Sequence, residues 1–227
     1  NNIMTDSIFF GAVISVVGYL IGIFLRKKIS VLNPLLVSII FVIAVIKIFH
    51  IDYETYNSGA KYISYLLTPA TVCLAIPLYR QISVLKEHAK EVFIGILAGV
   101  LASMGSILLM SYLFGLTHEQ YVTLLPKSIT TAIGMGVSEE LGGIQTITVA
   151  VIIITCVLGN IIAEAVLKIF RIKEPVAKGL AIGTASHAIG TTKALEIGEI
   201  EGAMSSLSVA VAGLMTVISA SIFANMM

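Results

Sequence analysis

Long apolar segments without charged residues recur along the whole chain and limit what it can fold into. The first, residues 7–25, has 19 residues and no charge, which is enough to cross about 30 Å of hydrocarbon as a helix. Because 57% of the residues are apolar and only 12% are charged, a soluble domain of this size could not bury its apolar surface. The sequence therefore predicts an all-α polytopic membrane protein.

Seven apolar segments predict about seven transmembrane helices, at residues 7–25, 29–49, 62–79, 92–116, 144–167, 176–192 and 203–224. Basic residues collect at 26–28, 80–91 and 168–178, and the positive-inside rule places these three stretches on the cytoplasmic side. No basic residue precedes the first segment, so we expect a retained helix with its N-terminus outside rather than a cleaved signal peptide.

The stretch 122–143 must leave and return on the same face of the membrane if the neighbouring segments 92–116 and 144–167 both cross it. Its 22 residues are too few for two crossings at 1.5 Å per residue. We therefore predict a re-entrant hairpin here, buried in protein or lining an aqueous cavity, because irregular backbone cannot face lipid at that depth.

Helix-breaking residues interrupt two of the predicted spans, with prolines in 62–79 and glycines in 176–192. The charge pattern runs the surrounding halves, about 29–116 and 144–224, in opposite directions. Inverted repeats with a discontinuous helix in each half are typical of secondary transporters, whose substrate lies where the breaks meet. We therefore predict a single transmembrane domain over 1–227 with a substrate site between the two breaks.

Lys127 lies inside the predicted re-entrant hairpin, beside Ser128, Thr130 and Thr131. Pro126 suits the first turn of a helix, so these polar residues would surround a half-helix N-terminus, whose free N–H groups and partial positive charge attract anions. Lys127 would add a point charge for a carboxylate. The alternative is that Lys127 extends to the outer headgroups.

His187 is an ionisable residue within a predicted span, among small and hydroxyl-bearing residues of which Thr184, Ser186, Gly190 and Thr191 are expected to bind substrate. Ionisable side chains at membrane depth are costly and therefore functional candidates. Imidazole titrates at about pH 6.5 in water, which suits proton coupling. The alternative is a neutral histidine that donates one hydrogen bond to a helix carbonyl.

Thr68, Pro69 and Thr71 form the matching break in the first half and are expected to complete the substrate site. A purely structural kink, in which the hydroxyls satisfy backbone groups freed by proline, is the alternative. Glu139 and Glu140 would lie where the hairpin returns to the outer face. These two acids are weak candidates for a gate and could equally be solvated turn residues.

Two further patterns have structural interpretations. Glu164 can pair with Lys168 at a spacing of four residues on one helix. Gly18 and Gly22 have the spacing of a small-residue packing face, which is common in membrane helices and says nothing about substrate.

Motifs of catalytic, cofactor and metal sites are absent from the sequence, which lacks HExxH, a P-loop and GxSxG. Ser186 and His187 are neighbours, so on a helix they point about 100° apart and cannot act as nucleophile and base. Cys73 and Cys156 have no metal-like spacing. A net charge of +1 gives no basis for nucleic-acid binding. We expect no enzyme, no cofactor and no metal.

Several stretches are specific enough to indicate a family: 67–72 (LTPATV), 75–79 (AIPLY), 126–128 (PKS), 183–191 (GTASHAIGT), 194–196 (ALE) and 201–206 (EGAMSS). Through them the chain resembles, from Leu66 onward, the LrgB/CidB family of antiholin-like membrane proteins associated with murein hydrolase export. One departure is Thr192-Lys193, where the family pattern has a small residue and arginine, although Lys193 still supplies a basic side chain.

The resemblance implies one of two functions. In one, the protein works with a small holin-like partner of the LrgA/CidA type and controls murein hydrolase activity and lysis. In the other, suggested by plastid relatives, it transports small monocarboxylates such as glycolate, glycerate or pyruvate. A holin-type lesion needs no intramembrane histidine, hairpin or paired breaks, so the residues favour transport.

We therefore expect a monocarboxylate transporter of the bacterial cell (inner) membrane, acting with an LrgA/CidA-type partner, in which His187 carries a coupling proton or helps to bind and orient the substrate. A regulatory antiholin-like subunit is the alternative, and a homo-oligomer is left open.

Overall fold

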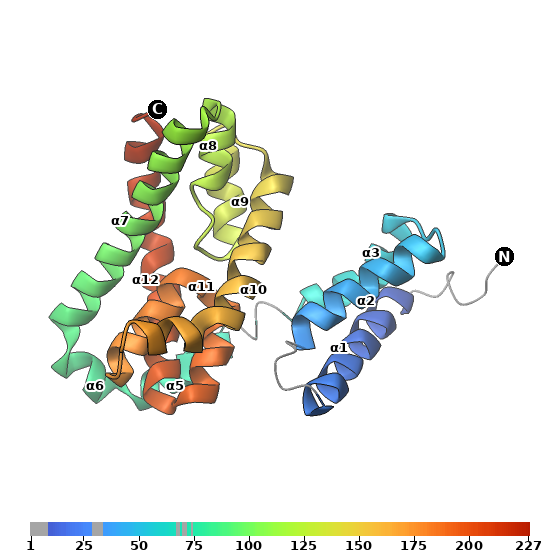
Figure 1. Cartoon of the computed structure of the whole chain (residues 1–227), viewed down its shortest axis with the longest axis horizontal. Helices are drawn as coiled ribbons and strands as arrows, with labels where there is room; N and C mark the ends of the chain where they lie inside the picture. Colours follow the sequence, from blue (N-terminus) through green and yellow to red (C-terminus); the bar gives the residue numbers. More distant parts are fainter. Residues whose placement is uncertain (1–8, 29–33, 67–68, 70–71, 74) are drawn as a thin grey trace. The chain divides into compact units, whose positions relative to one another are not determined.

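The computed structural model describes residues 9–28, 34–66, 69, 72–73 and 75–227. Throughout these residues the structure consists of α-helices and turns, with no strand, which confirms the predicted all-α class. The chain forms two compact units, residues 1–73 and 74–227 (Figure 1). The single transmembrane domain expected over 1–227 stays a prediction.

Unit 1 contains the described helices α1 (Phe10–Lys28), α2 (Pro34–Ile48) and α3 (Tyr53–Ser64). The small face predicted on α1 packs against α2: Gly22 lies on Pro34, and a Cβ at Gly18 would lie 2.9 Å from Phe41. Ser15 of α1 is hydrogen-bonded to the Tyr56 hydroxyl of α3 at 2.8 Å. These contacts hold the three helices together.

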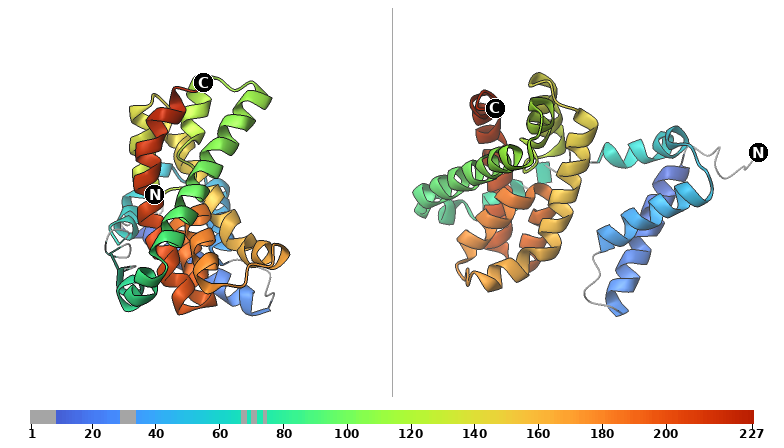
Figure 2. Two further views of the ribbon diagram at one scale, coloured as in Figure 1. Left: turned by 90° about the vertical axis from the view of Figure 1, so that its left-hand side faces the viewer. Right: turned by 45° about the horizontal axis from the view of Figure 1, so that its top comes forward.

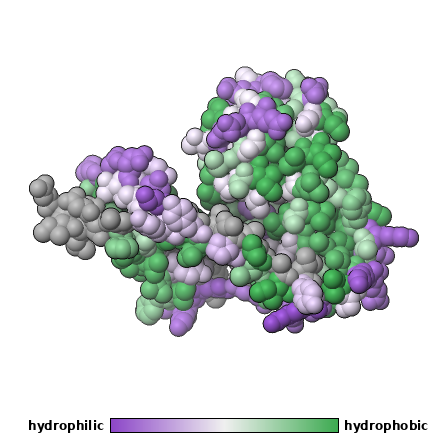
Figure 3. All heavy atoms as spheres, turned by 180° about the vertical axis from the view of Figure 1, so that it is seen from behind, coloured by the Kyte–Doolittle hydropathy of each residue, from purple (hydrophilic) through white to green (hydrophobic). Residues whose placement is uncertain are grey.

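Four described helices are long and apolar enough to cross a membrane: α1, α7 (Ala89–Phe114), α10 (Gln145–Ile169) and α12 (Glu199–Ala224). The last three belong to unit 2 and have 25 or 26 residues, so each is about 38 Å long at 1.5 Å per residue. On the face shown in Figure 3, apolar residues cover the middle of this unit and polar residues collect toward its ends. Two short helices, α5 (Ala75–Arg80) and α6 (Ile82–Glu87), precede α7.

The re-entrant course expected for 122–143 stays a prediction, but a helical hairpin does follow α7 and begins slightly before that stretch. It consists of α8 (His118–Leu124) and α9 (Thr131–Glu140), which both pack on α10. Buried hydroxyl groups hold it in place: the Thr148 hydroxyl of α10 lies 2.9 Å from the Thr123 carbonyl oxygen and 2.7 Å from the Ser138 hydroxyl. The turn of this outer hairpin, residues 125–130, reaches Ser103 near the middle of α7.

A second hairpin replaces the crossing expected at 176–192. Helix α11 (Pro175–Ile197) breaks at His187, where φ is 36° and ψ is −134°, which confirms the predicted break. Beyond it the chain folds back, because a Cβ at Gly190 would lie 3.1 Å from the Ile182 carbonyl oxygen. The crossing expected over 176–192 is therefore wrong: a first arm, 175–186, enters and a second arm, 188–197, returns to the same end.

The two hairpins belong to opposite ends of unit 2. We call the end at which α7 begins and α10 ends the basic end. The first arm of α11 starts there and the second arm ends there, since Lys178 pairs with Glu201 at the start of α12 and Lys193 pairs with Glu164 near the end of α10. Figures 1 and 2 show α8 and α9 at one end of the unit and α11 toward the other. Unit 2 thus alternates crossing helices with hairpins from opposite ends.

This alternation bears on two earlier expectations. Within unit 2 the helices long and apolar enough to cross a membrane are α7, α10 and α12, so the predicted total of about seven crossings is not confirmed. The inverted halves 29–116 and 144–224 also stay a prediction, because the matching break at Thr68 and Thr71 lies outside the described residues.

Candidate functional site

A cleft of about 980 Å³ lies within unit 2, between α7, α10 and the first arm of α11. The turn of the outer hairpin, with Lys127 and Ser128, lines it together with Thr184 and Ser186 at the tip of the α11 hairpin. The structure therefore brings together four of the residues that were predicted to bind substrate, from two segments almost sixty positions apart in the sequence.

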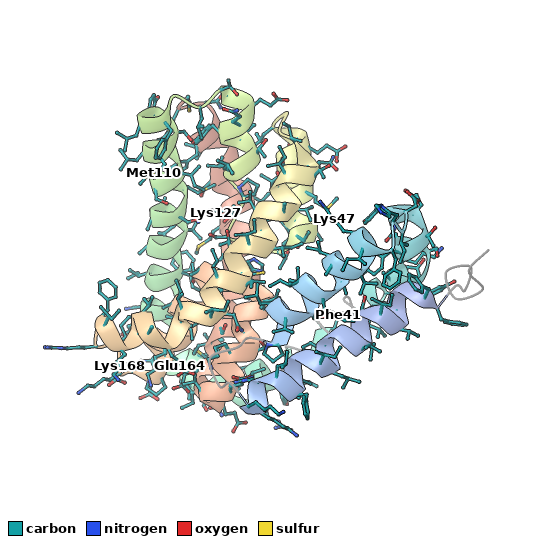
Figure 4. The ribbon with its side chains drawn as sticks, turned by 45° about the vertical axis from the view of Figure 1, so that its right-hand side comes forward. Phe41, Lys47, Met110, Lys127, Glu164 and Lys168 are labelled. Carbon is teal, nitrogen blue, oxygen red and sulfur yellow. The ribbon has the colours of Figure 1, made fainter. Side chains whose placement is uncertain are left out.

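Lys127 is the one lysine or arginine among the described residues that line the cleft. Its half-buried ammonium donates to the hydroxyls of Ser128 at 3.0 Å and Ser103 at 3.3 Å, and Ser103 donates to Ser128 at 3.0 Å. Figure 4 shows Lys127 in the interior of unit 2, away from its ends. Among the described residues no carboxylate lies within salt-bridge distance, so the charge of Lys127 is held by hydroxyls alone.

The tips of the two hairpins approach α7 at neighbouring turns. Ser103 contacts the outer hairpin, while a Cβ at Gly99 would collide with Thr184 of α11. These two positions are four residues apart, about 6 Å along a helix. The tip of α11 also touches α10, where Gly159 leaves space for the Ser186 hydroxyl. Small residues on both crossing helices thus admit the α11 tip.

His187 lies at the reversal of α11, 4% exposed, and its Nε2 atom has no hydrogen-bond partner. A left-handed φ is costly for a residue with a Cβ. The backbone of Ile152 in α10 contacts its imidazole. Thr191, one turn further on, donates to the His187 carbonyl at 3.1 Å and shares a hydrogen bond with Ser205 of α12 at 2.9 Å. His187 and Thr191 therefore lie behind the cleft wall and do not line it.

Gly190 has a role in the reversal rather than in the cleft. A Cβ there would lie 2.5 Å from the Ser186 side chain, closer than real Cβ atoms approach. Glycine at this position lets the two arms of α11 pack closely together beside the tip of the hairpin.

Other predicted site residues lie elsewhere. Thr130 is the N-cap of α9 and Thr131 its first residue, and neither lines the cleft. We expected Pro126 in the first turn of a helix, but it lies in the turn after α8. The half-helix starts one turn later, at Thr131. The exposed Glu139 and Glu140 are at the end of α9, remote from the cleft lining.

The predicted residues of the first break cannot be added to this site. Pro69 is exposed and belongs to unit 1. Thr68 and Thr71 lie outside the described residues. Their part in a substrate site stays a prediction.

The sequence interpretation missed the hydroxyl groups of the crossing helices. Ser103 and Ser106 of α7 and Thr155 of α10 line the cleft. The signal was a pair of serines three positions apart in an otherwise apolar helix, which places both on one face.

The mouth of the cleft is at the basic end. His88, Glu91 and Glu174 line it there, whereas no lining residue comes from residues 107–114 of α7 or 145–154 of α10, all of which the structure describes. The outer hairpin closes the other end. The cleft is thus a one-sided vestibule, with carboxylates at its mouth and an ammonium at its closed end.

Acidic, histidine and cysteine side chains do not cluster in this unit as metal ligands would. In the part of the chain that the structure describes, no three such residues come close enough to hold a metal ion. At the closed end of the cleft the polar groups are hydroxyl donors and one ammonium, a set that suits reversible binding of an anion.

Comparisons with known proteins give the family. The model of the LrgB-like family matches residues 15–226. The chain belongs to this family. Antiholin-like proteins LrgB from Bacillus mycoides (strain KBAB4), Bacillus cereus (strain B4264) and Bacillus anthracis (strain CDC 684 / NRRL 3495) are each 38% identical to it over 213 residues, covering 92% of this chain and 93% of the relative. No solved structure matches. The family expected from the sequence is thereby confirmed.

Proposed function

We propose that this LrgB-like membrane protein transports a small monocarboxylate through the cleft of unit 2. The observation that carries the proposal is the uncompensated ammonium of Lys127 at the closed end, surrounded by hydroxyl donors. A charge at membrane depth is costly without a partner, and one carboxylate would supply it. Because a single ammonium faces the cleft, an anion of one charge fits better than a dicarboxylate.

In this proposal the carboxylate enters from the basic end, which the positive-inside rule places in the cytoplasm. Its oxygen atoms replace the serine hydroxyls as hydrogen-bond acceptors of the Lys127 ammonium. They also accept hydrogen bonds from Ser128, Thr184 and Ser186 of the hairpin tips. Two hairpins from opposite ends that meet at the site supply the elements of alternating access: the α11 hairpin and α7 would close the present mouth, and the outer hairpin would then open.

His187 is proposed to carry the coupled proton. Its Nε2 atom is buried without a partner, directly behind Ser186. An unpaired buried charge is costly, so His187 would take up a proton only when an anion occupies the adjacent cleft. This dependence links proton uptake to substrate binding.

A second candidate function rests on the printed names of the relatives, which are antiholin-like proteins. In that case the chain would bind and restrain a holin-like membrane partner of the LrgA/CidA type. The two proposals are compatible if the partner assists transport, but a purely regulatory subunit has no use for a charged vestibule at membrane depth.

Uptake of labelled pyruvate and glycolate into proteoliposomes tests the proposal. The vesicles contain the full chain with or without a small holin-like partner, a trapped fluorescent dye and an imposed pH gradient. Saturable uptake without dye release is the expected result. Dye release without saturation would indicate an unselective pore, and no flux under either condition would favour the regulatory function.

A further inference from the structure

A second pocket, of about 530 Å³, lies at the base of the α11 hairpin, separate from the cleft. It is formed by the end of α10, the α10–α11 loop and both arms of α11, and we call it the basal pocket. Its charged lining residues are Glu164, Lys168, Arg171, Lys173, Lys178 and Glu196. It lies where the apolar helices reach the basic end, at the expected boundary between hydrocarbon and water.

The basal pocket has an excess of positive charge. Lys193 holds both Glu164 and Glu196, and Lys178 pairs with Glu201 at 3.5 Å. Counting the lining and these ion-pair partners, five cationic side chains (Lys168, Arg171, Lys173, Lys178, Lys193) face three carboxylates (Glu164, Glu196, Glu201), which leaves a net +2.

Three of the cations have no partner of opposite charge. Among the described residues, no carboxylate lies within salt-bridge distance of Lys168, Arg171 or Lys173. The helical pair expected between Glu164 and Lys168 does not form, because Lys193 of α11 takes Glu164. Figure 4 labels Glu164 and Lys168 together at the lower end of α10. Two of the free cations, Arg171 and Lys173, thus lie in the α10–α11 loop, whereas Glu164 and Glu196 are both paired with Lys193 of the second arm.

The backbone gives an independent reason to assign a function to Arg171. It ends α10 in a left-handed conformation with φ 56°, while Arg171 N–H donates to the Lys168 carbonyl and Ile172 N–H to the Leu167 carbonyl. Glycine is the usual residue at this position of such a helix end, because it has no Cβ. A guanidinium is therefore held over the pocket at the cost of backbone strain, and strain of this kind persists mainly where it serves a function.

We propose that the basal pocket binds a phosphate group, with Arg171, Lys168 and Lys173 as its ligands. Phosphate suits this set because a guanidinium binds two of its oxygens at once and ammonium groups complete its charge. Basic pockets between helices on the cytoplasmic side are a known form of lipid-headgroup site. The group could belong to an anionic phospholipid or to a soluble phosphate ester. Bound there, it would tie the α10–α11 loop to the second arm and steady the α11 hairpin.

Thermal unfolding of the purified full chain in a neutral detergent tests this site, independently of any transport. The added ligands are inorganic phosphate, glycerol phosphate and phosphatidylglycerol micelles, with phosphatidylcholine micelles and chloride at equal ionic strength as references. We expect a phosphate-bearing ligand to raise the midpoint of the wild type. Equilibrium dialysis with labelled phosphate, or with a labelled phosphatidylglycerol, measures the affinity directly.

The variant R171Q/K173Q is expected to bind about tenfold more weakly or worse, since each lost cation removes a charge-assisted hydrogen bond. K86Q/K90Q, which removes two lysines of the same end outside the pocket, should bind as the wild type does. If R171Q/K173Q does not fold, K168Q supplies the same comparison. Binding of the soluble phosphates identifies a site for a soluble metabolite. Binding of phosphatidylglycerol but not of the soluble phosphates identifies a lipid site.

Two results would overturn the proposal. One is a wild type whose unfolding midpoint and dialysis show no preference for phosphate over chloride. The other is equal weakening in the pocket variant and in K86Q/K90Q, which would mean that only the overall charge of this end matters.

Discussion

At the scale of single residues, the site depends on a few polar side chains in apolar surroundings. Such residues are visible in the sequence, which is why Lys127, Thr184 and Ser186 could be chosen before the structure. Their partners could not, because the contact of Ser103 with Lys127 is made between segments far apart in the chain. Thr130 and Thr131 do lie at a half-helix N-terminus, as expected, but that helix begins one turn later than Pro126 suggested, so neither residue lines the cleft.

Replacing Lys127 with glutamine should raise the half-saturation concentration for a monocarboxylate about tenfold or more, because a hydrogen bond to a charged group contributes about 1.5–3 kcal/mol. Initial uptake rates in proteoliposomes over a range of pyruvate concentrations measure the change. Lys90→Gln, which removes a lysine that does not line the cleft, is the matched control. An unaltered half-saturation concentration in Lys127→Gln would return this residue to a structural role.

Replacing His187 with alanine should remove the dependence of uptake on an imposed pH gradient while leaving membrane insertion intact. The reason is that the other histidine of the cleft, His88, is partly exposed at the mouth, whereas His187 is buried beside the hairpin tips. Uptake with and without the gradient, at equal protein content, gives the comparison, and His118→Ala at the opposite end serves as control. A gradient response that survives in His187→Ala would contradict proton coupling through this residue.

At the scale of elements, the two hairpins differ in how far they could be predicted. The outer hairpin could be expected from the length of the stretch 122–143, because its residues are too few to cross the membrane twice. The α11 hairpin did not, because its arms together have the length and hydropathy of one crossing. The reversal occurs at His187, a residue with a Cβ and a positive φ, and no turn dipeptide marks it. Close packing on α10 and α12, which needs Gly159 and Gly183, stabilises this conformation.

Substituting Gly159 with alanine should destabilise the contact between α10 and the α11 tip, because the new methyl group would overlap the Ser186 hydroxyl. The expected loss is about 1–3 kcal/mol, as for other overpacked sites, seen as a lower thermal midpoint in detergent. Gly105→Ala, at a position with nothing within 4 Å, should be neutral. Adding Ser186→Ala should recover part of the loss, and a Gly159→Ala midpoint equal to that of Gly105→Ala would show that the tip does not sit against α10.

At the scale of the whole molecule, composition predicts a membrane protein and charge predicts its basic end, and the family match agrees with the membrane class. The count of about seven crossings is not confirmed, because hydropathy cannot distinguish a helix that crosses from one that returns. Three crossing helices in unit 2 place Asn225, just after α12, at the end opposite to the α10–α11 loop.

Single cysteines should report this arrangement. In a background with Cys73 and Cys156 replaced by alanine, Asn225→Cys should react with an impermeant maleimide in intact cells, and Lys173→Cys only in inverted vesicles. The seven-crossing topology, in which 176–192 crosses, places both positions on the cytoplasmic side. Labelling of both variants from that side would therefore restore the crossing and contradict the α11 hairpin.

The central claim is that a carboxylate binds in the cleft between the hairpin tips, and substrate protection of Ala185→Cys tests it most directly. Ala185 is exposed and lines the cleft beside Ser186. In inverted vesicles of the same cysteine-free background, an impermeant maleimide should label this cysteine. Pyruvate should slow the labelling, the neutral propionamide should not, and Lys127→Gln should abolish the protection. Labelling at the same rate with and without pyruvate, in a protein whose Lys127 is intact, would contradict the account.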